Sequence, residues 1–282
     1  MTLAATQPLS KEGSSLEPYS PQQIDSFRQT FAENGYLVLP GAVPPPLLGE
    51  LRGSLVAEFE KANSTGKLFA GGGRLTGHLN CYPGAGARPV YQALEQRGII
   101  GLARLLFPQS VRFPNVGCNF NLPGSVEQHY HADRPFTNDF PIVNVAVVDT
   151  DLVNGAIDVL PGTHRKFEPF WRMAMRGAWR DSTRISMKQG DVLVRTSNLW
   201  HRGMPNRSQL PRPMLAFTWE DGGSTNPDPF AWNEGRVAFI PNWYRTNLLG
   251  RLRERTYLAA PITYSAYRFV KSLVDGTKGY DH

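Results

Sequence analysis

The hydrophobic positions of the chain follow two different periods. In the first third of the chain, apolar residues recur three and four positions apart, which is the spacing of one face of a helix. Ser20 and Pro21 suit the cap and the first turn of the first such segment. The pattern predicts helices at 21–34, 44–59 and 90–106, and a short strand at 36–39.

From Val111 onward the pattern changes to short apolar runs that alternate with turn residues. Many short strands at this spacing are typical of an antiparallel sandwich or barrel. The expected fold class is therefore mainly β with flanking helices. Strands are predicted at 116–121, 127–132, 142–149, 156–160, 183–187, 191–195 and 214–220.

The chain divides into a short tail and one large unit. Residues 1–20 are polar and lack a helical or strand period, so we expect a mobile N-terminal tail. We expect residues 21–282 to form a single domain. Its β-rich core is predicted at about 111–220, and the aromatic-rich segment 221–282 is predicted to close one end of the fold.

Four segments outside the predicted strands have expected structures of their own. The glycine-rich stretch 66–88 and the stretch 221–250 are candidate lids over a pocket, because long loops in compact domains often carry function. The glycine-rich stretch contains no GxxxxGK[ST] motif, so a phosphate-binding loop is unsupported. Residues 167–180 are expected to form a helix or a packed loop, and a final helix is expected near 265–274.

Composition narrows the class of protein. With 282 residues, 41% of them hydrophobic and 19% charged, the chain resembles ordinary globular proteins, and 27 glycines and 23 prolines favour a β-rich or loop-rich fold. The sequence shows no pattern of a signal peptide or membrane span, and two cysteines argue against a disulfide scaffold, so we expect a cytoplasmic protein. The net charge of +6 is scattered, which favours an anionic substrate or cosubstrate over nucleic acid.

The first candidate chemistry lies in the middle of the chain. His131 and Asp133 are two residues apart, directly after a predicted strand. On an extended backbone, side chains two apart point to the same face, so the imidazole and the carboxylate could bind one metal ion together. Two protein ligands are too few for a tight site. A third ligand is therefore expected from elsewhere in the chain.

His201 is the best candidate for that third ligand. It lies at the start of a turn after the predicted strand 191–195, and Arg212 begins the next strand eleven residues later. In an antiparallel pair, residues on either side of a turn are neighbours, so His201 and Arg212 can face one cavity. Two histidines and one carboxylate form the facial set of non-haem Fe(II) oxygenases. An arginine fork near that metal can hold the far end of a dicarboxylate.

Together these residues resemble the phytanoyl-CoA dioxygenase family. The resemblance covers roughly residues 24–220. His-x-Asp alone is a weak motif, but it becomes specific in combination with the segment that ends in Pro-Gly-Thr-His and with a histidine followed by an arginine at eleven residues. The residues that carry the resemblance are His131-Ala132-Asp133, the segment 154–164, Gly190-Asp191, His201 and Arg212.

The resemblance implies a double-stranded β-helix (jelly-roll) core and an Fe(II)-dependent oxygenase that uses 2-oxoglutarate and O2. It implies that iron is held by His131, Asp133 and His201, and that Arg212 pairs with the distal carboxylate of 2-oxoglutarate. Since Asp133 is present, a halogenase is disfavoured, because those enzymes replace the carboxylate with a small residue.

Three further positions follow from the same resemblance. Asn119 matches a residue that contacts the other carboxylate of 2-oxoglutarate, and Gln128 matches a position that faces the pocket. One departure is evident. Relatives often carry a serine two residues after the second histidine, where it helps to bind the cosubstrate, and here Gly203 stands in its place.

The other histidines have more modest expected roles. His129 is expected to support the site without binding metal, and His164 to brace a turn by hydrogen bonds. His78 is balanced between contact with substrate and loop structure, and His282 lies at the end of the chain. Substrate contacts are expected at His78, Asn80 and Trp232.

The expected function is oxidation of a small-molecule metabolite, with release of succinate and CO2. Hydroxylation is the leading reaction, while ring closure, desaturation and ketone formation remain open, and specialised metabolism is the expected setting. The expected partner is a small molecule, without nucleic acid or membrane, and the protein is a monomer or homo-oligomer. The alternatives are a cupin-like Zn- or Mn-dependent hydrolase or isomerase, disfavoured by Arg212, and a non-catalytic binding relative, disfavoured by the intact triad.

Overall fold

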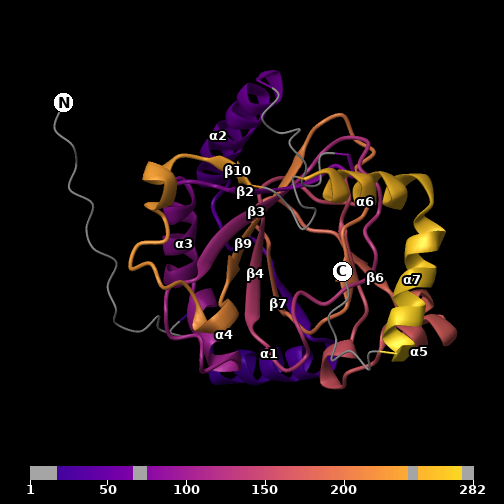
Figure 1. The fold of residues 1–282 in the computed structure, drawn as a ribbon. Helices are drawn as coiled ribbons and strands as arrows, with labels where there is room; N and C mark the ends of the chain where they lie inside the picture. Colours follow the sequence, from indigo (N-terminus) through magenta and orange to yellow (C-terminus); the bar gives the residue numbers. More distant parts are fainter. Residues whose placement is uncertain (1–17, 66–74, 241–246, 275–282) are drawn as a thin grey trace.

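Two antiparallel sheets form the centre of the computed structural model, which describes residues 18–65, 75–240 and 247–274 (Figure 1). The larger sheet has the strand order β1-β7-β4-β9-β3-β2-β10, and the smaller has the order β6-β5-β8. The strands are β1 Tyr36–Leu39, β2 His78–Tyr82, β3 Asn115–Asn121, β4 Pro141–Ala146, β5 Ile157–Val159, β6 Thr183–Ile185, β7 Val192–Thr196, β8 His201–Arg202, β9 Arg212–Thr218 and β10 Ala238–Ile240.

The helices lie in two groups on opposite sides of these sheets (Figure 1). The first group, formed by the helices within residues 21–106, covers the outer face of the large sheet. The second group, formed by the helices within residues 170–175 and 248–274, lies beside the small sheet. The helices are α1 Pro21–Asn34, α2 Pro45–Ser64, α3 Ala87–Gln96, α4 Ile99–Leu106, α5 Phe170–Met175, α6 Leu248–Ala259 and α7 Pro261–Val274. The short 3-10 turns are η2 Thr163–Arg165, η3 Ala178–Asp181, η4 Glu220–Gly222 and η5 Trp232–Gly235.

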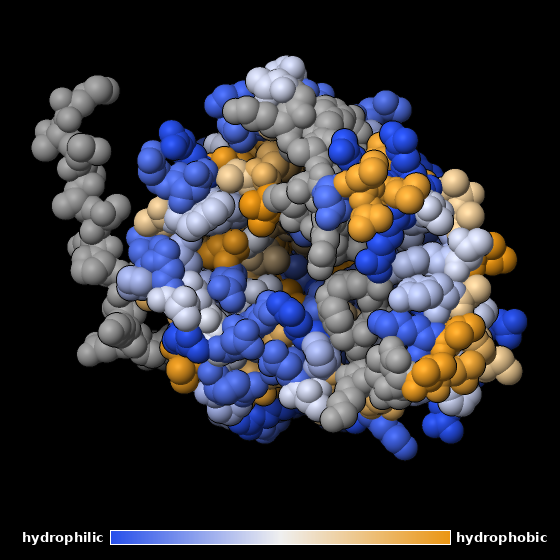
Figure 2. All heavy atoms as spheres, viewed as in Figure 1, coloured by the Kyte–Doolittle hydropathy of each residue, from blue (hydrophilic) through white to orange (hydrophobic). Residues whose placement is uncertain are grey.

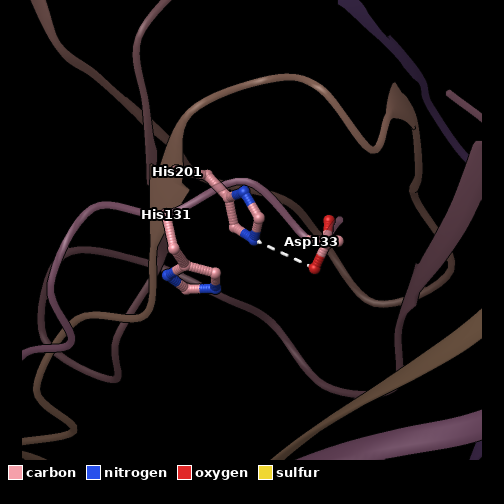
Figure 3. Close-up of side chains that lie close together, drawn as sticks. All are labelled: His131, Asp133 and His201. Atoms are coloured by element: carbon pink, nitrogen blue, oxygen red, sulfur yellow. Dashed lines mark ion pairs between the residues drawn. The ribbon is translucent and has the colours of Figure 1, made fainter. Parts of the chain in front are cut away.

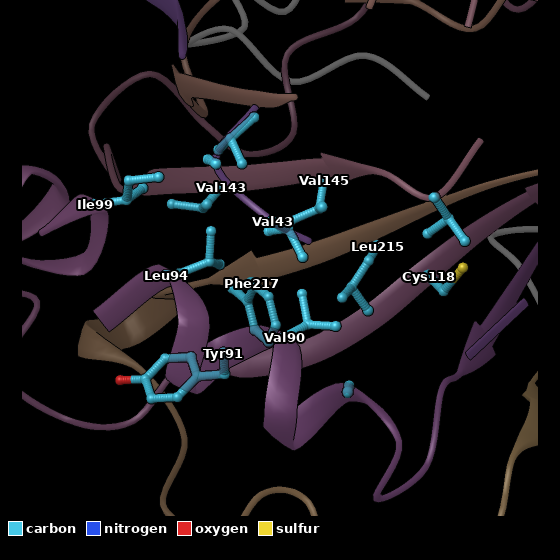
Figure 4. Packing of buried hydrophobic residues seen from close by; sticks show 14 of the residues in the cluster. Val43, Val90, Tyr91, Leu94, Ile99, Cys118, Val143, Val145, Leu215 and Phe217 are labelled. Atoms are coloured by element: carbon cyan, nitrogen blue, oxygen red, sulfur yellow. The ribbon is translucent and has the colours of Figure 1, made fainter. Parts of the chain in front are cut away.

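Strand β9 shows how the large sheet separates two environments. Leu215 and Phe217 are fully buried against the first group of helices, and Figure 4 shows this packing beside Tyr91 of α3. Arg212, Met214 and Ala216 alternate with these residues along the strand and therefore point to the other face. One face is therefore an apolar core and the other faces a cavity between the two sheets.

The first helix follows its sequence signals closely. The Ser20 hydroxyl accepts a hydrogen bond from Gln23 N, and the Gln23 side chain accepts one from Ser20 N, which makes a reciprocal capping box. Gly35 closes the other end by donating its backbone N–H to Phe31 O. The predicted helix at 21–34 and the strand at 36–39 are both confirmed.

Several predicted boundaries are wrong. The glycine-rich stretch contains strand β2, and the predicted helix at 90–106 is two helices, because Gly98 adopts a left-handed φ of 70° that a continuing helix cannot contain. Residues 127–132 do not form a named strand and make only an isolated bridge at His131. Strands β8 and β10 and helix α6 were not predicted.

The expected fold class is confirmed: the protein is mainly β with flanking helices around a jelly-roll core. The predicted N-terminal tail lies almost entirely outside the described residues. Within the described ranges, every helix is too short or too polar to cross a bilayer. Exposed hydrophobic side chains gather on α6 and α7, on the right of Figure 2; they are Leu248, Leu249, Leu252, Ile262, Val270 and Val274.

Candidate metal centre

The structure brings His131, Asp133 and His201 together, although the last is seventy residues from the first (Figure 3). One nitrogen or oxygen atom from each lies within 4.8 Å of the others. His131 and His201 face each other across an antiparallel bridge, with both N–O distances at 2.9 Å. Asp133 is fixed two residues later by a hydrogen bond from its backbone N to Ser197 O, at 3.0 Å.

In both histidines Nδ1 is bonded to the backbone, which leaves Nε2 for the space between the three side chains. His131 Nδ1 lies 2.8 Å from His129 O, and His201 Nδ1 lies 2.9 Å from Leu199 O. Since a carbonyl oxygen only accepts, each Nδ1 carries the proton and each Nε2 keeps its lone pair. Carbonyl bonds of this kind orient histidine ligands in metal sites. The donor set therefore fits a divalent metal bound by two Nε2 atoms and one carboxylate.

The two oxygens of the Asp133 carboxylate have different neighbours. Its Oδ2 accepts a hydrogen bond from Arg195 Nη1 at 2.5 Å, and its Oδ1 lies 3.7 Å from His201 Nε2. Burial is the largest influence and by itself would raise the pKa of Asp133, but the Arg195 guanidinium together with the nearby His201 and His131 outweighs burial and holds that pKa well below its ordinary value. The carboxylate is therefore ionised at neutral pH.

The electrostatics of the histidines favour the form that a metal needs. Burial, assisted by the Arg195 charge, lowers the pKa of His201 to about 3. Burial also lowers the pKa of His131. Both imidazoles are therefore neutral at pH 7, and a cation does not have to displace a proton from either ring.

The triad opens into a cavity of about 730 Å³ between the two sheets. Its walls come from alternate residues of the large-sheet strands, with one side closed by helix α7. The lining residues used below are Asn80, Asn119, Gln128, Phe140, Ile142, Asn144, Leu193, Arg195, Gly203, Arg212, Met214, Thr218, Tyr264 and Arg268.

Arg212 lies in the wall of this cavity and is almost fully buried. Its Nη2 donates to Gly155 O at 3.1 Å, while its buried Nε has no hydrogen-bond partner among the described residues. Burial lowers the pKa of Arg212 to about 10, so the guanidinium keeps its charge at neutral pH. A buried arginine with an unused donor is suited to an anionic ligand, because a carboxylate would satisfy both the charge and the N–H.

The amides that were predicted near this arginine share its region of the sheet. Asn119 on β3 lies opposite Met214 of β9 and opposite Asn80 of β2, and all three side chains line the cavity. Arg212 itself lies opposite Asn121 on the same strand β3. The sheet therefore places a guanidinium and two carboxamides along one wall.

Gly203 and Gln128 are coupled. Gln128 Oε1 accepts a hydrogen bond from Gly203 N at 2.8 Å, and Gly203 O accepts one from Gln128 N at 2.8 Å. A Cβ added at Gly203 would lie 2.7 Å from Gln128 Oε1 and 2.9 Å from His78 Cε1. The backbone there is ordinary, so glycine is required for space. The Gln128 side chain occupies the room that a serine side chain would need.

The remaining predicted contacts lie in different places. His78 is buried in β2 with its Nε2 2.6 Å from Val126 O, and burial lowers its pKa to about 4. It stands behind the cavity wall and is not part of the lining. Trp232 is 48% exposed and packs edge-on against Tyr82, with ring centroids 4.8 Å apart, also outside the lining.

The other histidines lie away from the three donor atoms. His129 is packed between Tyr257 and Tyr264, at centroid distances of 4.8 Å and 4.9 Å. His164 lies in the turn η2 against Phe31, with ring centroids 6.3 Å apart. His282 lies outside the described residues.

Two groups of cavity residues were missed from the sequence. Arg195 and Asn144 lie on the buried strands β7 and β4, and a charged residue within the run Val-Leu-Val-Arg-Thr was a signal that could have identified the first. Tyr264 and Arg268 come from α7, and no local pattern connected that helix to the metal centre.

The fold and the site define a jelly-roll protein in which two histidines and one carboxylate form a candidate metal centre. The chain belongs to the family described as phytanoyl-CoA dioxygenase (PhyH), whose model matches residues 31–214. This confirms the resemblance drawn from the sequence, and iron with 2-oxoglutarate is the cofactor pair expected of the family.

Several solved structures share the fold. The epimerase SnoN in complex with Fe3+, alpha ketoglutarate and nogalamycin RO has a TM-score of 0.51 and 17% identity, covering 71% of this chain and 84% of that chain. AviO1 from Streptomyces viridochromogenes Tue57 has a TM-score of 0.52 and 16% identity, covering 71% and 96%. The alpha ketoglutarate dependent carbocyclase SnoK from nogalamycin biosynthesis has a TM-score of 0.50 and 14% identity, covering 76% and 86%.

Proposed function

We propose that this protein is an Fe(II)- and 2-oxoglutarate-dependent dioxygenase that oxidises a small-molecule metabolite in natural-product biosynthesis. One observation carries the proposal: the facial triad and a buried, charged arginine with an unused donor line the same cavity. Family membership supports the same cofactor pair. When bound, iron and 2-oxoglutarate supply the oxidising chemistry, with release of succinate and CO2.

The residues of the cavity have distinct roles in this proposal. His131, Asp133 and His201 would hold the metal through the atoms that their protein partners leave available, which are Nε2, Oδ1 and Nε2. Arg212 pairs with the distal carboxylate of 2-oxoglutarate, because its guanidinium is charged, lies in the buried wall of the cavity and has an unused Nε donor. Asn119 and the Gln128 amide are proposed as further contacts to the cosubstrate.

The remaining lining residues indicate the kind of substrate that the cavity would accept. Phe140, Ile142 and Leu193 supply apolar surface, while Thr218 supplies a hydroxyl. Together with the Tyr264 phenol of α7, this lining suits a compact molecule with an apolar ring and a few polar groups. Hydroxylation is the proposed reaction. The solved structures of similar fold include an epimerase and a carbocyclase, so other oxidations on the same scaffold are the alternative outcomes.

Anaerobic titration tests the function directly. The purified protein is mixed with Fe(II) and then with 2-oxoglutarate, and a weak metal-to-ligand charge-transfer band is sought in the visible spectrum. The wild type should develop the band. The Arg212→Ala variant should bind Fe(II) but need far more 2-oxoglutarate to develop it. The matched control is Arg88→Ala, which removes an arginine paired with Asp228 outside the cavity. A wild type without the band overturns the proposal.

The second candidate is a Zn- or Mn-dependent hydrolase or isomerase on the same metal ligands. Such an enzyme has no use for a buried arginine in the cavity wall, and Arg212 therefore disfavours it. The distinguishing result is binding of 2-oxoglutarate. Zn-loaded protein that ignores 2-oxoglutarate in calorimetry, with no charge-transfer band for Fe(II), would favour this alternative.

We also propose that residues 21–282 act as one catalytic unit in a reducing, cytoplasmic compartment. The proposal of one unit is supported by α7, because Tyr264 and Arg268 line the same cavity as the β-strand residues. The compartment is supported by Cys81 and Cys118, which lie directly opposite each other on β2 and β3 and are both free thiols. Removal of α6 and α7 should therefore abolish 2-oxoglutarate turnover.

A further inference from the structure

We infer that Arg195 is a positioning residue that commits one oxygen of Asp133 to itself, so that the other oxygen alone faces the metal. This inference rests on the metal site of the proposed function. Arg195 is not a member of the triad. It acts through the Asp133 carboxylate, and the observations that follow concern how firmly that carboxylate is held.

The guanidinium of Arg195 is itself fixed at two points. It is only 5% exposed, its Nη1 donates to Asp133 Oδ2 at 2.5 Å, and its Nε donates to Asn144 Oδ1 at 3.2 Å. Asn144 lies on strand β4, which pairs with the strand β7 that carries Arg195. Both strands belong to the interior of the large sheet. The arginine therefore holds the carboxylate in a fixed position relative to the sheet.

Asp133 needs this support because its own backbone offers little. The residue lies outside the named strands, and the backbone bond to Ser197 O fixes its main chain but not the rotation of its carboxylate. Its two oxygens are chemically equivalent until something distinguishes them. Here Arg195 takes Oδ2, and Oδ1 remains on the side of His201 Nε2. A metal then receives one oxygen from Asp133, and its remaining positions stay open.

A competing electrostatic effect can be separated by experiment. The positive charge of Arg195 by itself repels a cation, so its removal would strengthen metal binding if the charge were its only influence. If instead Arg195 acts by holding Asp133, its removal weakens binding. The two effects have opposite signs, and the second one vanishes when Asp133 is absent.

The test measures Co(II) affinity in the absence of 2-oxoglutarate, by competition with a chelator. Arg195→Met should weaken Co(II) binding roughly 10- to 100-fold, the usual effect of losing a group that orients a metal ligand. In an Asp133→Ala background, the same Arg195→Met change should leave the affinity equal or slightly stronger. Arg195→Lys should recover part of the loss, since an ammonium can reach Oδ2 but cannot also bond Asn144. Arg88→Met, in an ion pair outside the cavity, is the matched control and should change nothing.

Two results would overturn the inference. One is wild-type or stronger Co(II) affinity in folded Arg195→Met, and the other is an equal loss with and without Asp133. If Arg195→Met does not fold, Asn144→Ala releases the far end of the guanidinium and should weaken Co(II) binding roughly 3- to 10-fold, about one hydrogen bond. An unchanged affinity in folded Asn144→Ala then counts against the inference. Because Co(II) binding requires no 2-oxoglutarate, failure of the proposed oxygenase function would be seen separately, as a missing charge-transfer band in the wild type.

Discussion

The two ends of the cavity hold their functional side chains by different means. At the metal end, the ligands come from the two-residue strand β8 and from a segment outside the named strands, and each one is fixed by a further bond to its side chain. At the other end, Arg212 begins β9, which lies between β3 and β4. Its backbone is held by strand pairing, and its Nε is left unused. His201 is also held by strand pairing, and Arg212 Nη2 also donates to Gly155 O, so the two ends differ in what they leave for a ligand. The metal end offers acceptor atoms, and Arg212 offers a donor N–H.

The largest effect should come from removing the carboxylate at the metal end. Asp133→Ala should weaken Fe(II) or Co(II) binding by roughly 100-fold or more, because changes to groups that merely orient a ligand already cost 10- to 100-fold. Calorimetry on the metal-free protein measures this. The control is Asp149→Asn, which alters an exposed carboxylate paired with Lys188. Equal affinities in the two variants would remove Asp133 from the metal site.

The next prediction concerns the stability of the fold, which should change without a change in ligand binding at either end of the cavity. Phe217→Ala removes a fully buried ring that packs on Tyr91 and Phe230 behind the cavity wall. The free energy of unfolding should fall by about 3–5 kcal/mol, measured by denaturant titration. Metal affinity of the folded fraction should stay at the wild-type value, since the residue faces the helix layer. A loss below about 1 kcal/mol would contradict the described packing.

A smaller effect is expected at the contact between Gly203 and Gln128. Gly203→Ala places a methyl group 2.7 Å from Gln128 Oε1, and the flexible amide will move aside. We expect 2-oxoglutarate binding to weaken about tenfold, equivalent to roughly 1.4 kcal/mol, with little change in metal affinity. The charge-transfer titration measures both. In the double variant with Gln128→Ala, only the buried His78, whose Cε1 lies 2.9 Å from the added carbon, still crowds the methyl group, so the alanine at 203 should cost less than it does alone. A full additional loss in the double variant would show that the two residues are independent.

The last effect concerns acid stability and is confined to low pH. Burial lowers the pKa of His129 from 6.5 to about 3, with the nearby Arg268 charge acting in the same direction. Between these values the unfolded chain binds a proton that the folded protein does not, so stability is complete above pH 6.5 and falls as the pH drops towards 3. His129→Phe should therefore lose about 2 kcal/mol less than the wild type between pH 7 and pH 5 in metal-free unfolding experiments. Identical losses would place the acid sensitivity in other groups.

The sequence was most informative where spacing and chemistry coincide. His131 and Asp133 were identified by their separation of two, and His201 and Arg212 by their place around a turn, and the structure brings all four to one cavity. The family assignment rests on the same residues and is confirmed. The roles of the individual side chains remain predictions.

Other features depend on contacts that no local pattern records. Strand β2 has nearly all of its residues buried, so it shows no alternation, and it lies within a glycine-rich stretch that resembles a loop. Residues 127–132 make single backbone bonds, such as Gln128 N to Gly203 O, and form no continuous ladder, so strand propensity did not produce a strand. The contribution of α7 to the cavity depends on how the end of the chain folds back, which is a property of the tertiary structure alone.

The carbonyl bonds to His131 Nδ1 and His201 Nδ1 have a consequence for how the protein acquires its metal in a cell. Because both rings already have their final tautomer and orientation, any divalent ion of similar size meets a finished set of donors. Zinc, cobalt and nickel bind such nitrogen and oxygen sites more tightly than Fe(II) does. A rigid site of this kind cannot reject them by reorganising. We therefore expect the metal-loaded fraction of the protein in a cell to depend on the supply of iron relative to its competitors.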